Sequence, residues 1–424
     1  MVAPRAVVID DGLGRFGPMT ALRAVFEIRT GIDTTLRRIE RFSPAGVAAL
    51  AVPPELRAMI AARASVPVNA LPPGAAEVLL LNGRLLLPGT LPLPARGEAI
   101  IDADGAIVAA RLERADAARL VDALAARGSV DASALPERMP REVLAASPLV
   151  RRPWDVLCQI PQTIAHDVIA GRPDHAIEAA PAEVIGDAIV SVEAGAQICP
   201  GVVIDAGAGP VAILAGAVIR PHATLCGPCA IGPGAVVAEQ AVIRGATIIG
   251  PRCKVGGEVS ATIFQGFANK AHDGFFGDSY VGKWVNIGAG SITSNLLNTY
   301  GDVPMRLGRE LPRERSGRTF LGALIGDHAK LAIGTRIMTG SAIGIGAMIA
   351  TTAPPPTWVP PFAWLVDGDD RPARRWRRDR FEETLRTVMA RRGVEPERAY
   401  IEAIRAAYDR EAGAEAGPAA APET

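Results

Sequence analysis

The chain has 424 residues with equal numbers of basic and acidic side chains, 45 of each, and 49% of its residues are hydrophobic. This length suits two or three domains with a large core, and the balanced charge provides no overall attraction to nucleic acid or to an anionic membrane, so we expect neither partner. Five cysteines are too few for a disulfide framework, and the start lacks the apolar run of a signal peptide, so we expect a cytoplasmic protein with free thiols.

Residues 1–160 are predicted to form an α/β domain. Ala6–Ile9 and Val78–Leu81 are apolar runs that are typical of buried strands. Segments 34–42 and 54–64 carry apolar residues at helical spacing. Strands that alternate with helices favour a parallel sheet.

A glycine-rich segment follows the first strand and reads Gly12-Leu13-Gly14-Arg15-Phe16-Gly17. Its spacing also fits a dinucleotide-binding loop, but Pro18 stands where the helix of that motif should continue. The backbone N–H groups of such a loop can hold phosphates, and Arg15 would neutralise their charge. We therefore name four candidate nucleotide-binding residues, which are Gly12, Gly14, Arg15 and Asn82.

A six-residue repeat governs the middle of the chain. Every sixth residue is aliphatic in the series Ile213, Ile219, Leu225, Ile231, Val237, Ile243, Ile249 and Val255. The residues four places later are nearly all small, and the frame also runs through 192–204 and returns over 325–349. A period of six fits neither a helix nor an alternating strand, and a β-sandwich would show turn signals at a wider spacing than this.

The repeat predicts a parallel β-helix over residues 183–353, after a connector at 161–182. Three hexads would close one triangular coil of about 18 residues, and the coils would stack at the ~4.8 Å spacing of strands. Pro354-Pro355-Pro356 is expected to end the stack. A helical extension is predicted over 354–410, with helices at 374–392 and 396–410, followed by a disordered tail over 411–424.

The hexads are interrupted between Val259 and Ile325, and insertions in a rigid stack are where function is expected. This window includes Asn269-Lys270-Ala271-His272-Asp273-Gly274, then 285–291 and 293–295. Acyl transfer to an amine needs a base for the amine proton and donors for the thioester oxyanion. His272 could supply the base, and the backbone at Gly288–Gly290 could supply the donors.

The motifs Lys-Ala-His, Gly-Asp, Val-Asn-Ile-Gly-Ala-Gly and Thr-x-Asn resemble the acetyltransferase half of the bifunctional bacterial enzymes that make UDP-N-acetylglucosamine. More closely, the whole chain resembles a divergent sugar nucleotidyltransferase branch of that family. The supporting stretches are Pro153-Trp154-Asp155, 250–258, 269–274 and 294–301. The resemblance implies a left-handed β-helix, acetyl-CoA as acyl donor, and a homotrimer in which the insertion at 296–319 reaches a neighbour.

By position, the resemblance makes His272 the general base, Asn295 and Asn286 groups that orient the base and the sugar, and the Ala289 amide an oxyanion contact. Phe275 stands where better-known members carry a tyrosine that holds the substrate, so the substrate can differ. The phosphate-binding lysine of the family has no counterpart here. The remaining candidates for substrate contacts are Glu258, Lys254 and Lys270, with Arg252 and Arg306 as further basic residues.

Simpler interpretations stand beside these roles. Asn286 and Asn295 could form asparagine ladders or turns, and Glu258 could pair with an arginine. Cys226-x-x-Cys229 has the spacing of half a zinc site but has no second pair, so no metal site is expected there.

In the N-terminal domain, the glycine-rich loop resembles a sugar nucleotidyltransferase loop. The acidic residue that would hold Mg²⁺ after the next strand is missing from its expected place, because Leu81-Asn82-Gly83 is followed by Arg84. Asp10, Asp11 or Asp102 could substitute for it. Mg²⁺ is therefore expected only if this domain is catalytic.

Three functions follow as hypotheses. The first is acetyl-CoA-dependent N-acetylation of an amino sugar phosphate, with glucosamine 1-phosphate implied by the resemblance. The second is sugar-1-phosphate nucleotidyl transfer with a purely structural β-helix. The third is a non-catalytic scaffold that binds a sugar nucleotide.

Overall fold

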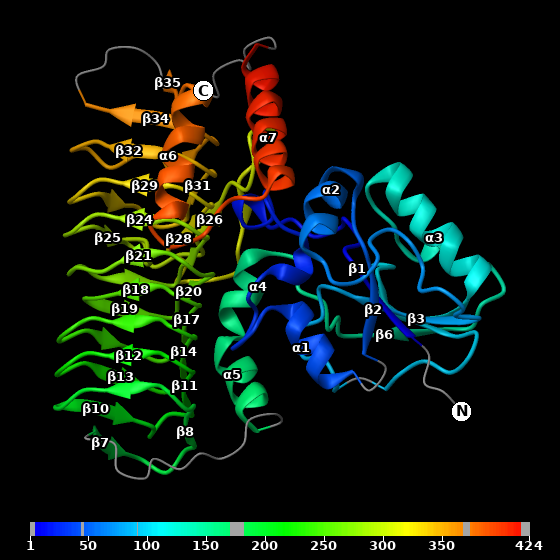
Figure 1. Cartoon of the computed structure of the whole chain (residues 1–424), viewed down its shortest axis with the longest axis horizontal. Coiled ribbons are helices and arrows are strands. Elements are labelled where there is room, and N and C mark those ends of the chain that lie inside the picture. Colours follow the sequence, from blue (N-terminus) through cyan, green and yellow to red (C-terminus); the bar gives the residue numbers. More distant parts are fainter. Residues whose placement is uncertain (1–4, 44–45, 91, 170–181, 368–373, 417–424) are drawn as a thin grey trace.

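The computed structural model describes residues 5–43, 46–90, 92–169, 182–367 and 374–416. An N-terminal α/β domain lies beside a tall stack of short strands, and two C-terminal helices lie against the upper part of that stack (Figure 1). The predicted combination of an α/β domain, a parallel β-helix and C-terminal helices is confirmed. The left-handed sense of the β-helix stays a prediction. None of the described helices combines the length and the apolar character needed to cross a membrane.

The N-terminal domain is built on a six-stranded sheet in the order β2-β1-β3-β5-β4-β6. Its strands are β1 (Arg5–Ile9), β2 (Val47–Ala51), β3 (Glu77–Asn82), β4 (Ala99–Asp102), β5 (Ile107–Glu113) and β6 (Arg141–Leu144). Strands β1, β2 and β3 are parallel, but β5 runs antiparallel to both of its neighbours. The sheet is therefore mixed, and not parallel throughout as predicted. The reason is Asp104-Gly105, where Gly105 at φ +80° allows a tight β4–β5 hairpin.

Helices α1 (Thr35–Phe42) and α2 (Pro54–Arg63) lie at the predicted places. Helix α3 (Arg114–Arg127) and the short 3-10 segments η1 (Gly17–Met19), η2 (Val25–Glu27) and η3 (Ala132–Ala134) were not predicted. Thr34 caps α1 by accepting a hydrogen bond from the backbone N–H of Arg37. Leu120 and Leu124 of α3 are fully buried against strands β1, β3 and β5, so one face of the sheet forms the core with α3.

From β7 to β34 the chain forms a parallel β-helix with three faces. The first face has β7 (Ala182–Ile185), β10 (Val202–Asp205), β13 (Thr224–Cys226), β16 (Val242–Ile243), β19 (Glu258–Ser260) and β22 (Phe276–Gly277). The second has β8 (Val190–Val192), β11 (Val211–Ile213), β14 (Cys229–Ile231), β17 (Thr247–Ile249), β20 (Ile263–Phe264), β23 (Tyr280–Val281), β28 (Ala323–Ile325), β31 (Ser341–Ile343) and β33 (Trp358–Val359). The third has β9 (Gln197–Ile198), β12 (Val218–Ile219), β15 (Val236–Val237), β18 (Lys254–Val255), β21 (Asn269–Lys270), β24 (Asn286–Ile287), β29 (Lys330–Leu331), β32 (Met348–Ala350) and β34 (Ala363–Val366), to which β35 (Arg374–Arg375) adds antiparallel. A separate parallel pair joins β25 (Ile292–Thr293) to β30 (Arg336–Ile337).

The ladder register confirms the hexad prediction. Ile213 pairs with Ile231, and Ile231 pairs with Ile249, so each coil consists of three hexads. These aliphatic side chains are fully buried inside the prism. Each contributes roughly 1.5–3 kcal/mol through its burial, which the cost of ordering the chain offsets in part.

The stack continues beyond its predicted end at residue 353. Strands β33 and β34 pair in parallel with β31 and β32 and carry the β-helix to Val366. The three prolines at 354–356 lie between β32 and β33, in the part of the coil that crosses the first face. No described strand occupies the first face in that coil. Proline has no N–H to donate to a ladder, so the run removes one strand without ending the stack.

The C-terminal helices are α6 (Arg378–Ala390) and α7 (Arg398–Ala416). Figure 1 shows α6 along the stack and α7 between the stack and α2. Phe381 of α6 and Ile404 of α7 are buried in one cluster with Phe362 of the stack. The predicted tail is thus helical up to Ala416, and its remainder, 417–424, lies outside the described residues.

Two segments fill the space between the N-terminal domain and the stack. Helices α4 (Pro153–Cys158) and α5 (Ile160–Ile169) occupy part of the predicted connector, and residues 170–181 lie outside the described residues. The insertion at 296–319 contains a hairpin of β26 (Pro304–Met305) and β27 (Glu314–Arg315). Its Val303 and Met305 are buried with Met19 and Trp154 of the same chain. The insertion therefore packs on the N-terminal part of its own chain, because its apolar side chains find partners there, and the expectation that it also reaches a neighbouring subunit stays a prediction.

Candidate functional site

His272 lies in the turn between β21 and β22, at the corner where the third face of the prism meets the first. Its side chain is exposed. Inward residues Lys270 and Phe276 bracket the turn, with five residues between them as in a regular hexad. The coil below is shorter, because only three residues separate its inward residues Val255 and Val259.

Two glycines allow the turn of His272 to rest on this shortened corner. A Cβ on Gly256 would lie 2.5 Å from the carbonyl oxygen of Ala271, and a Cβ on Gly257 would lie 2.9 Å from the Cα of Asp273. Gly257 also has φ +71°, which other residues adopt with strain. The close backbone contact therefore fixes the height of the His272 turn on the stack.

Lys270 stands in an aliphatic slot of the repeat, paired with Val255 in the ladder, and is 2% exposed. Its Nζ donates to the carbonyl oxygens of Gly256 at 2.9 Å, His272 at 2.7 Å and Asp273 at 3.3 Å. Burial lowers the pKa of Lys270 to about 8, although Asp273 acts in the opposite direction. All three ammonium donors are occupied, which contradicts the prediction that Lys270 contacts a substrate phosphate. It fixes the backbone that carries His272.

The next coil places a glycine-rich turn, Gly288-Ala289-Gly290, directly above the His272 turn. The backbone N–H of Thr293 donates to the carbonyl oxygen of Phe275 at 3.0 Å. A Cβ on Gly274 would lie 2.3 Å from the carbonyl oxygen of Ser291. The turns of His272 and Ala289, which belong to successive coils, are therefore neighbours on one edge of the prism.

Both predicted asparagines make hydrogen bonds within the stack. Asn286 is exposed on β24 and accepts a hydrogen bond from Nδ2 of Asn269 in the coil below, at 3.0 Å. Nδ2 of Asn295 donates to Oδ2 of Asp278 at 2.7 Å. Burial raises the pKa of Asp278, although the Asn295 hydrogen bond and the charge of Arg318 oppose it. The simpler interpretation of asparagine ladders or turns therefore accounts for one hydrogen bond of each side-chain amide.

The remaining predicted substrate contacts are spread over the surface around this corner. Glu258 accepts a hydrogen bond from Nε of Arg244 at 2.5 Å, as its simpler interpretation expects. Lys254 is exposed on β18, two coils below Asn286. Phe275 is half-buried, and its ring lies beside Gly277, where a Cβ would come within 2.5 Å of the ring.

The two further arginines lie elsewhere. Arg252 donates to the carbonyl oxygen of Arg392 at 2.7 Å and lies over the ring of Phe267, so it joins the stack to the C-terminal helices. Arg306 is half-buried in the insertion.

A second candidate site is a cavity of about 260 Å³ beside the glycine-rich loop. Of the four predicted nucleotide-binding residues, Gly12 and Gly14 line the cavity, whereas Arg15 is exposed outside the lining and Asn82 is fully buried. Other walls come from α2 and α7, and sequence reasoning did not identify them. They include Glu55, Leu56, Ala403, Ala406 and Arg410.

Two of the three carboxylates that could replace the missing acid, Asp11 and Asp102, do not fit a Mg²⁺ site. Asp11 is bound by Arg84 through Nε–Oδ1 at 2.9 Å and Nη2–Oδ2 at 2.5 Å, and Asn82 donates to the same carboxylate at 2.8 Å. Asp102 accepts hydrogen bonds from Ser147 and Arg151. No group of three acidic, histidine or cysteine side chains suited to a metal occurs within the described ranges. Mg²⁺ needs carboxylate oxygens that are not neutralised by a cation, so Asp11 and Asp102 do not replace the missing ligand.

Asp10 differs from these two acids because it lines the cavity. Its oxygens accept hydrogen bonds from the backbone N–H groups of Val25 at 2.8 Å and Gly12 at 3.2 Å. Burial raises the pKa of Asp10 to about 6. The cavity therefore has an acidic wall that changes charge near neutral pH.

Two comparisons with known proteins bear on both sites. Residues 7–172 match the family model described as sugar nucleotidyl transferase. A bifunctional sugar-1-phosphate nucleotidylyltransferase/acetyltransferase of Sulfurisphaera tokodaii is 32% identical over 87 residues, which cover 20% of this chain and 21% of that protein. The chain thus matches about a fifth of the length of that relative, and the activity and substrates of the whole protein are proposals. Residues 7–172 are therefore similar to a sugar nucleotidyl transferase domain, in line with the sequence resemblance, and the parallel β-helix follows them in the chain.

Proposed function

We propose that the β-helix transfers an acetyl group from acetyl-CoA to the amine of an amino sugar phosphate, with glucosamine 1-phosphate as the acceptor and His272 as the general base. The observation that carries this proposal is the exposed imidazole on a turn that Lys270 fixes from inside the prism. The relative from Sulfurisphaera tokodaii is named as an acetyltransferase as well as a nucleotidylyltransferase, which supports this proposal.

The proposed reaction uses groups on two neighbouring turns. His272 takes the proton of the amine as its nitrogen attacks the thioester carbonyl, the C–N bond forms, and the C–S bond breaks. The coenzyme A thiolate leaves and receives the proton. The backbone N–H of Ala289 would donate to the oxygen that becomes negative, a role in which a rigid donor is most effective. Because the Lys270 hydrogen bonds hold the His272 turn before substrate arrives, little ordering remains to be done during the reaction.

The assembly and location belong to the same proposal. We propose a homotrimer in which the corner with His272 faces a neighbouring prism, so that exposed Asn286 and Lys254 contact the substrates between subunits. A cytoplasmic location goes with acetyl-CoA and sugar phosphates as substrates.

The test is release of the coenzyme A thiol from acetyl-CoA in the presence of glucosamine 1-phosphate. We expect His272→Ala to lower turnover by about 10²–10⁴-fold, the usual contribution of a general base. His222→Ala is a matched control, because His222 is exposed in the turn between β12 and β13, at the same prism corner in a lower coil. Equal turnover by the His272 variant and the wild type would contradict the proposal.

A second candidate function is nucleotidyl transfer in the N-terminal domain. The match over residues 7–172 and the cavity at Gly12 and Gly14 favour it. The phosphate of a sugar 1-phosphate would attack the α-phosphate of a nucleoside triphosphate and release pyrophosphate. The carboxylate of Asp11 is already bound by Arg84 and does not fit the metal that this chemistry commonly uses.

Pyrophosphate release from UTP and N-acetylglucosamine 1-phosphate tests this candidate. Arg410→Ala removes an exposed guanidinium from the cavity wall and should lower the rate, while Arg398→Ala, at the start of the same helix, should not. UTP binding without pyrophosphate release would instead support the hypothesis of a domain that only binds sugar nucleotides.

A further inference from the structure

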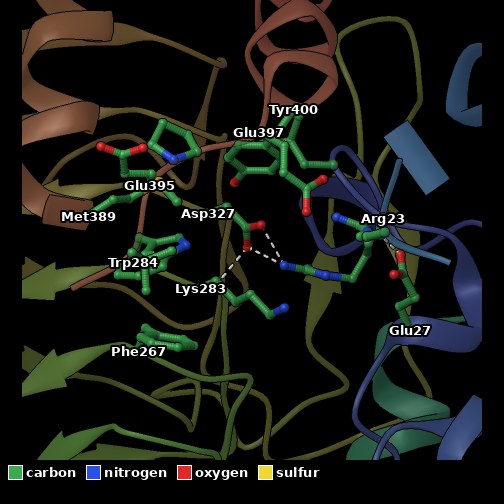
Figure 2. A pocket seen from close by; sticks show the side chains of 14 residues that line it. Arg23, Glu27, Phe267, Lys283, Trp284, Asp327, Met389, Glu395, Glu397 and Tyr400 are labelled. Atoms are coloured by element: carbon green, nitrogen blue, oxygen red, sulfur yellow. Dashed lines mark hydrogen bonds and ion pairs between the residues drawn. The ribbon is translucent and has the colours of Figure 1, made fainter. Parts of the chain in front are cut away.

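A second cavity, of about 220 Å³, lies where the three parts of the molecule meet. Figure 2 shows Arg23 and Glu27 reaching it from the N-terminal domain, Lys283 and Trp284 from the stack, and Tyr400 from α7. None of these residues takes part in the reactions proposed above. The volume is close to that of a monosaccharide phosphate.

The floor of the cavity is an ion pair that is already complete. Arg23 Nη2 lies 2.5 Å from Oδ2 and 2.6 Å from Oδ1 of Asp327, and both side chains are almost fully buried. The backbone N–H of Lys283 also donates to Oδ1 of Asp327 at 2.8 Å. These contacts satisfy the carboxylate of Asp327, and its ion pair with Arg23 has no net charge.

The ammonium of Lys283 is not neutralised in the same way. The nearest acids have other partners, since Asp327 pairs with Arg23 and Glu27 pairs with Arg63 at 2.5 Å. Lys283 is half-buried, and burial, aided by the charge of Arg23, lowers its pKa to about 8, while Glu27 and Asp327 act in the opposite direction. A half-buried cation that has no hydrogen-bonding partner for its Nζ among the described residues is costly, and an anion in the cavity would remove that cost.

The remaining walls suit a sugar ring. The rings of Trp284 and Phe267 are stacked with centroids 4.3 Å apart, and both residues line the cavity. Trp284 also stacks on His328, and Arg252 lies over the ring of Phe267, so the two aromatic residues present ring edges to the cavity. The exposed carboxylates of Glu395 and Glu397 stand at the rim, where they can accept hydrogen bonds from hydroxyl groups. Apolar ring edges, acceptors for hydroxyls and the Lys283 cation together match a phosphorylated sugar better than an aromatic anion, which would leave the two rim carboxylates without donors.

We propose that this cavity is a binding site for a sugar phosphate, with the phosphate on Lys283, the sugar ring against the edges of Trp284 and Phe267, and its hydroxyls on Glu395 and Glu397. The site is separate from the corner that carries His272 and from the cavity at Gly12. It joins parts of the chain that are far apart in sequence, so the bound molecule would hold the N-terminal domain, the stack and α7 together.

The site is also connected to the glycine-rich loop. Leu22 and Arg23 line the junction cavity, whereas the adjoining Thr20 and Ala21 line the cavity at Gly12. Helix α7 also lines both cavities, with Tyr400 at the junction cavity and Ala403 at the cavity beside Gly12. A sugar phosphate at the junction is therefore expected to change the affinity of the loop cavity for UTP, a consequence that rests on the proposed function of that cavity.

The first experiment labels the full chain with pyridoxal 5′-phosphate, a phosphorylated aldehyde. A neutral lysine amine condenses with the aldehyde, water leaves, and borohydride then delivers a hydride to the C=N bond to give a stable secondary amine. The chain has four lysines, at 254, 270, 283 and 330, so mass spectrometry can assign the label. We expect glucose 1-phosphate to reduce labelling of Lys283 at least tenfold. Equal labelling of Lys283 with and without glucose 1-phosphate would overturn the proposal.

The second experiment measures binding of glucose 1-phosphate, glucose and inorganic phosphate by calorimetry. We expect glucose 1-phosphate to bind at least tenfold more tightly than either fragment, and Lys283→Met or Lys283→Gln to remove that advantage. Arg119→Met is the control, because Arg119 is an exposed cation of α3 that lines neither cavity, and it should bind as the wild type does. Binding should weaken above pH 8, as Lys283 loses its proton in the field of Arg23, Arg63, Glu27 and Asp327. Inorganic phosphate binding as tightly as glucose 1-phosphate would refute the sugar assignment, even if both transferase activities are absent.

Discussion

The interior of the β-helix and its junction with the N-terminal domain are held together differently. Inside the prism, aliphatic side chains recur in every hexad and meet their equivalents in the next coil, as Ile231 and Ile249 do. At the junction, Arg38 of α1 pairs with Asp167 of α5 at 2.8 Å, and Arg23 pairs with Asp327 of the stack. These pairs join residues 129 and 304 positions apart.

This contrast indicates which part of the molecule tolerates change. Loss of one methylene from a repeated apolar core removes a small part of a large sum. Loss of one member of a buried ion pair leaves a charge without a partner in a medium that solvates it poorly. The junction should therefore be more sensitive to single substitutions than the stack, although it contains fewer interactions.

Asp167→Ala should have the largest effect. Burial acts to raise the pKa of Asp167, but the hydrogen bonds of His166 and Arg38 outweigh it and lower the pKa below its ordinary value. Removal of the carboxylate strands the fully buried Arg38, so the free energy of unfolding should fall by about 3–5 kcal/mol, as measured by urea denaturation at pH 7. Glu40→Ala, which breaks the exposed pair with Arg37, should cost less than about 1 kcal/mol. Equal losses from both substitutions would remove the contrast between buried and exposed pairs.

Lys270→Met should have an intermediate effect. Methionine fits the aliphatic slot, but the buried carbonyl oxygens of Gly256 and His272 lose their donor, and the free energy of unfolding should fall by about 1–3 kcal/mol. Acetyl transfer should fall as well, because the turn of His272 is no longer fixed. Arg119→Met, which breaks an exposed ion pair on α3, should lower the free energy of unfolding by less than about 1 kcal/mol and leave acetyl transfer unchanged. A variant more stable than the wild type would show that Lys270 does not stabilise the turn.

Ile243→Val should cost about 0.5–1.5 kcal/mol, because it removes one methylene from the prism interior. The same substitution at Ile231, in a different coil, should cost a similar amount, since both side chains are fully buried. Urea denaturation of both variants measures this. A loss as large as that of Asp167→Ala would mean that the stack is not more tolerant than the junction.

The smallest expected effect is on pH dependence. Lys270 has a pKa of about 8 in the folded chain, against an ordinary value of 10.5. Between these values the unfolded chain binds the proton and the folded chain does not, so the contribution of Lys270 to stability rises as pH increases above 8. The stability of the wild type relative to Lys270→Met should therefore increase from pH 7 to pH 9, by about 1 kcal/mol at most. Taking the difference cancels the opposing titration of the buried cysteines and tyrosines.

Local patterns were sufficient for much of the fold. The hexads predicted the β-helix and its coil length, and apolar spacing predicted α1, α2 and the two C-terminal helices. The glycine-rich loop predicted one edge of a cavity, and the break in the repeat singled out His272. Each of these signals lies within a few residues, where backbone geometry and the burial of one face leave little choice.

Long-range pairing settled the rest. The break in the repeat that singled out His272 also made Lys270 a candidate for phosphate binding. In the structure, three backbone carbonyl groups from two coils enclose its ammonium. Arg84 replaces an expected acid, and the structure turns it onto Asp11. Helix α7 closes a cavity whose opposite wall begins at Asp10, in the first strand-to-loop segment of the chain. The free energy of a buried charge depends on which groups replace its water, and chain folding alone brings those groups together.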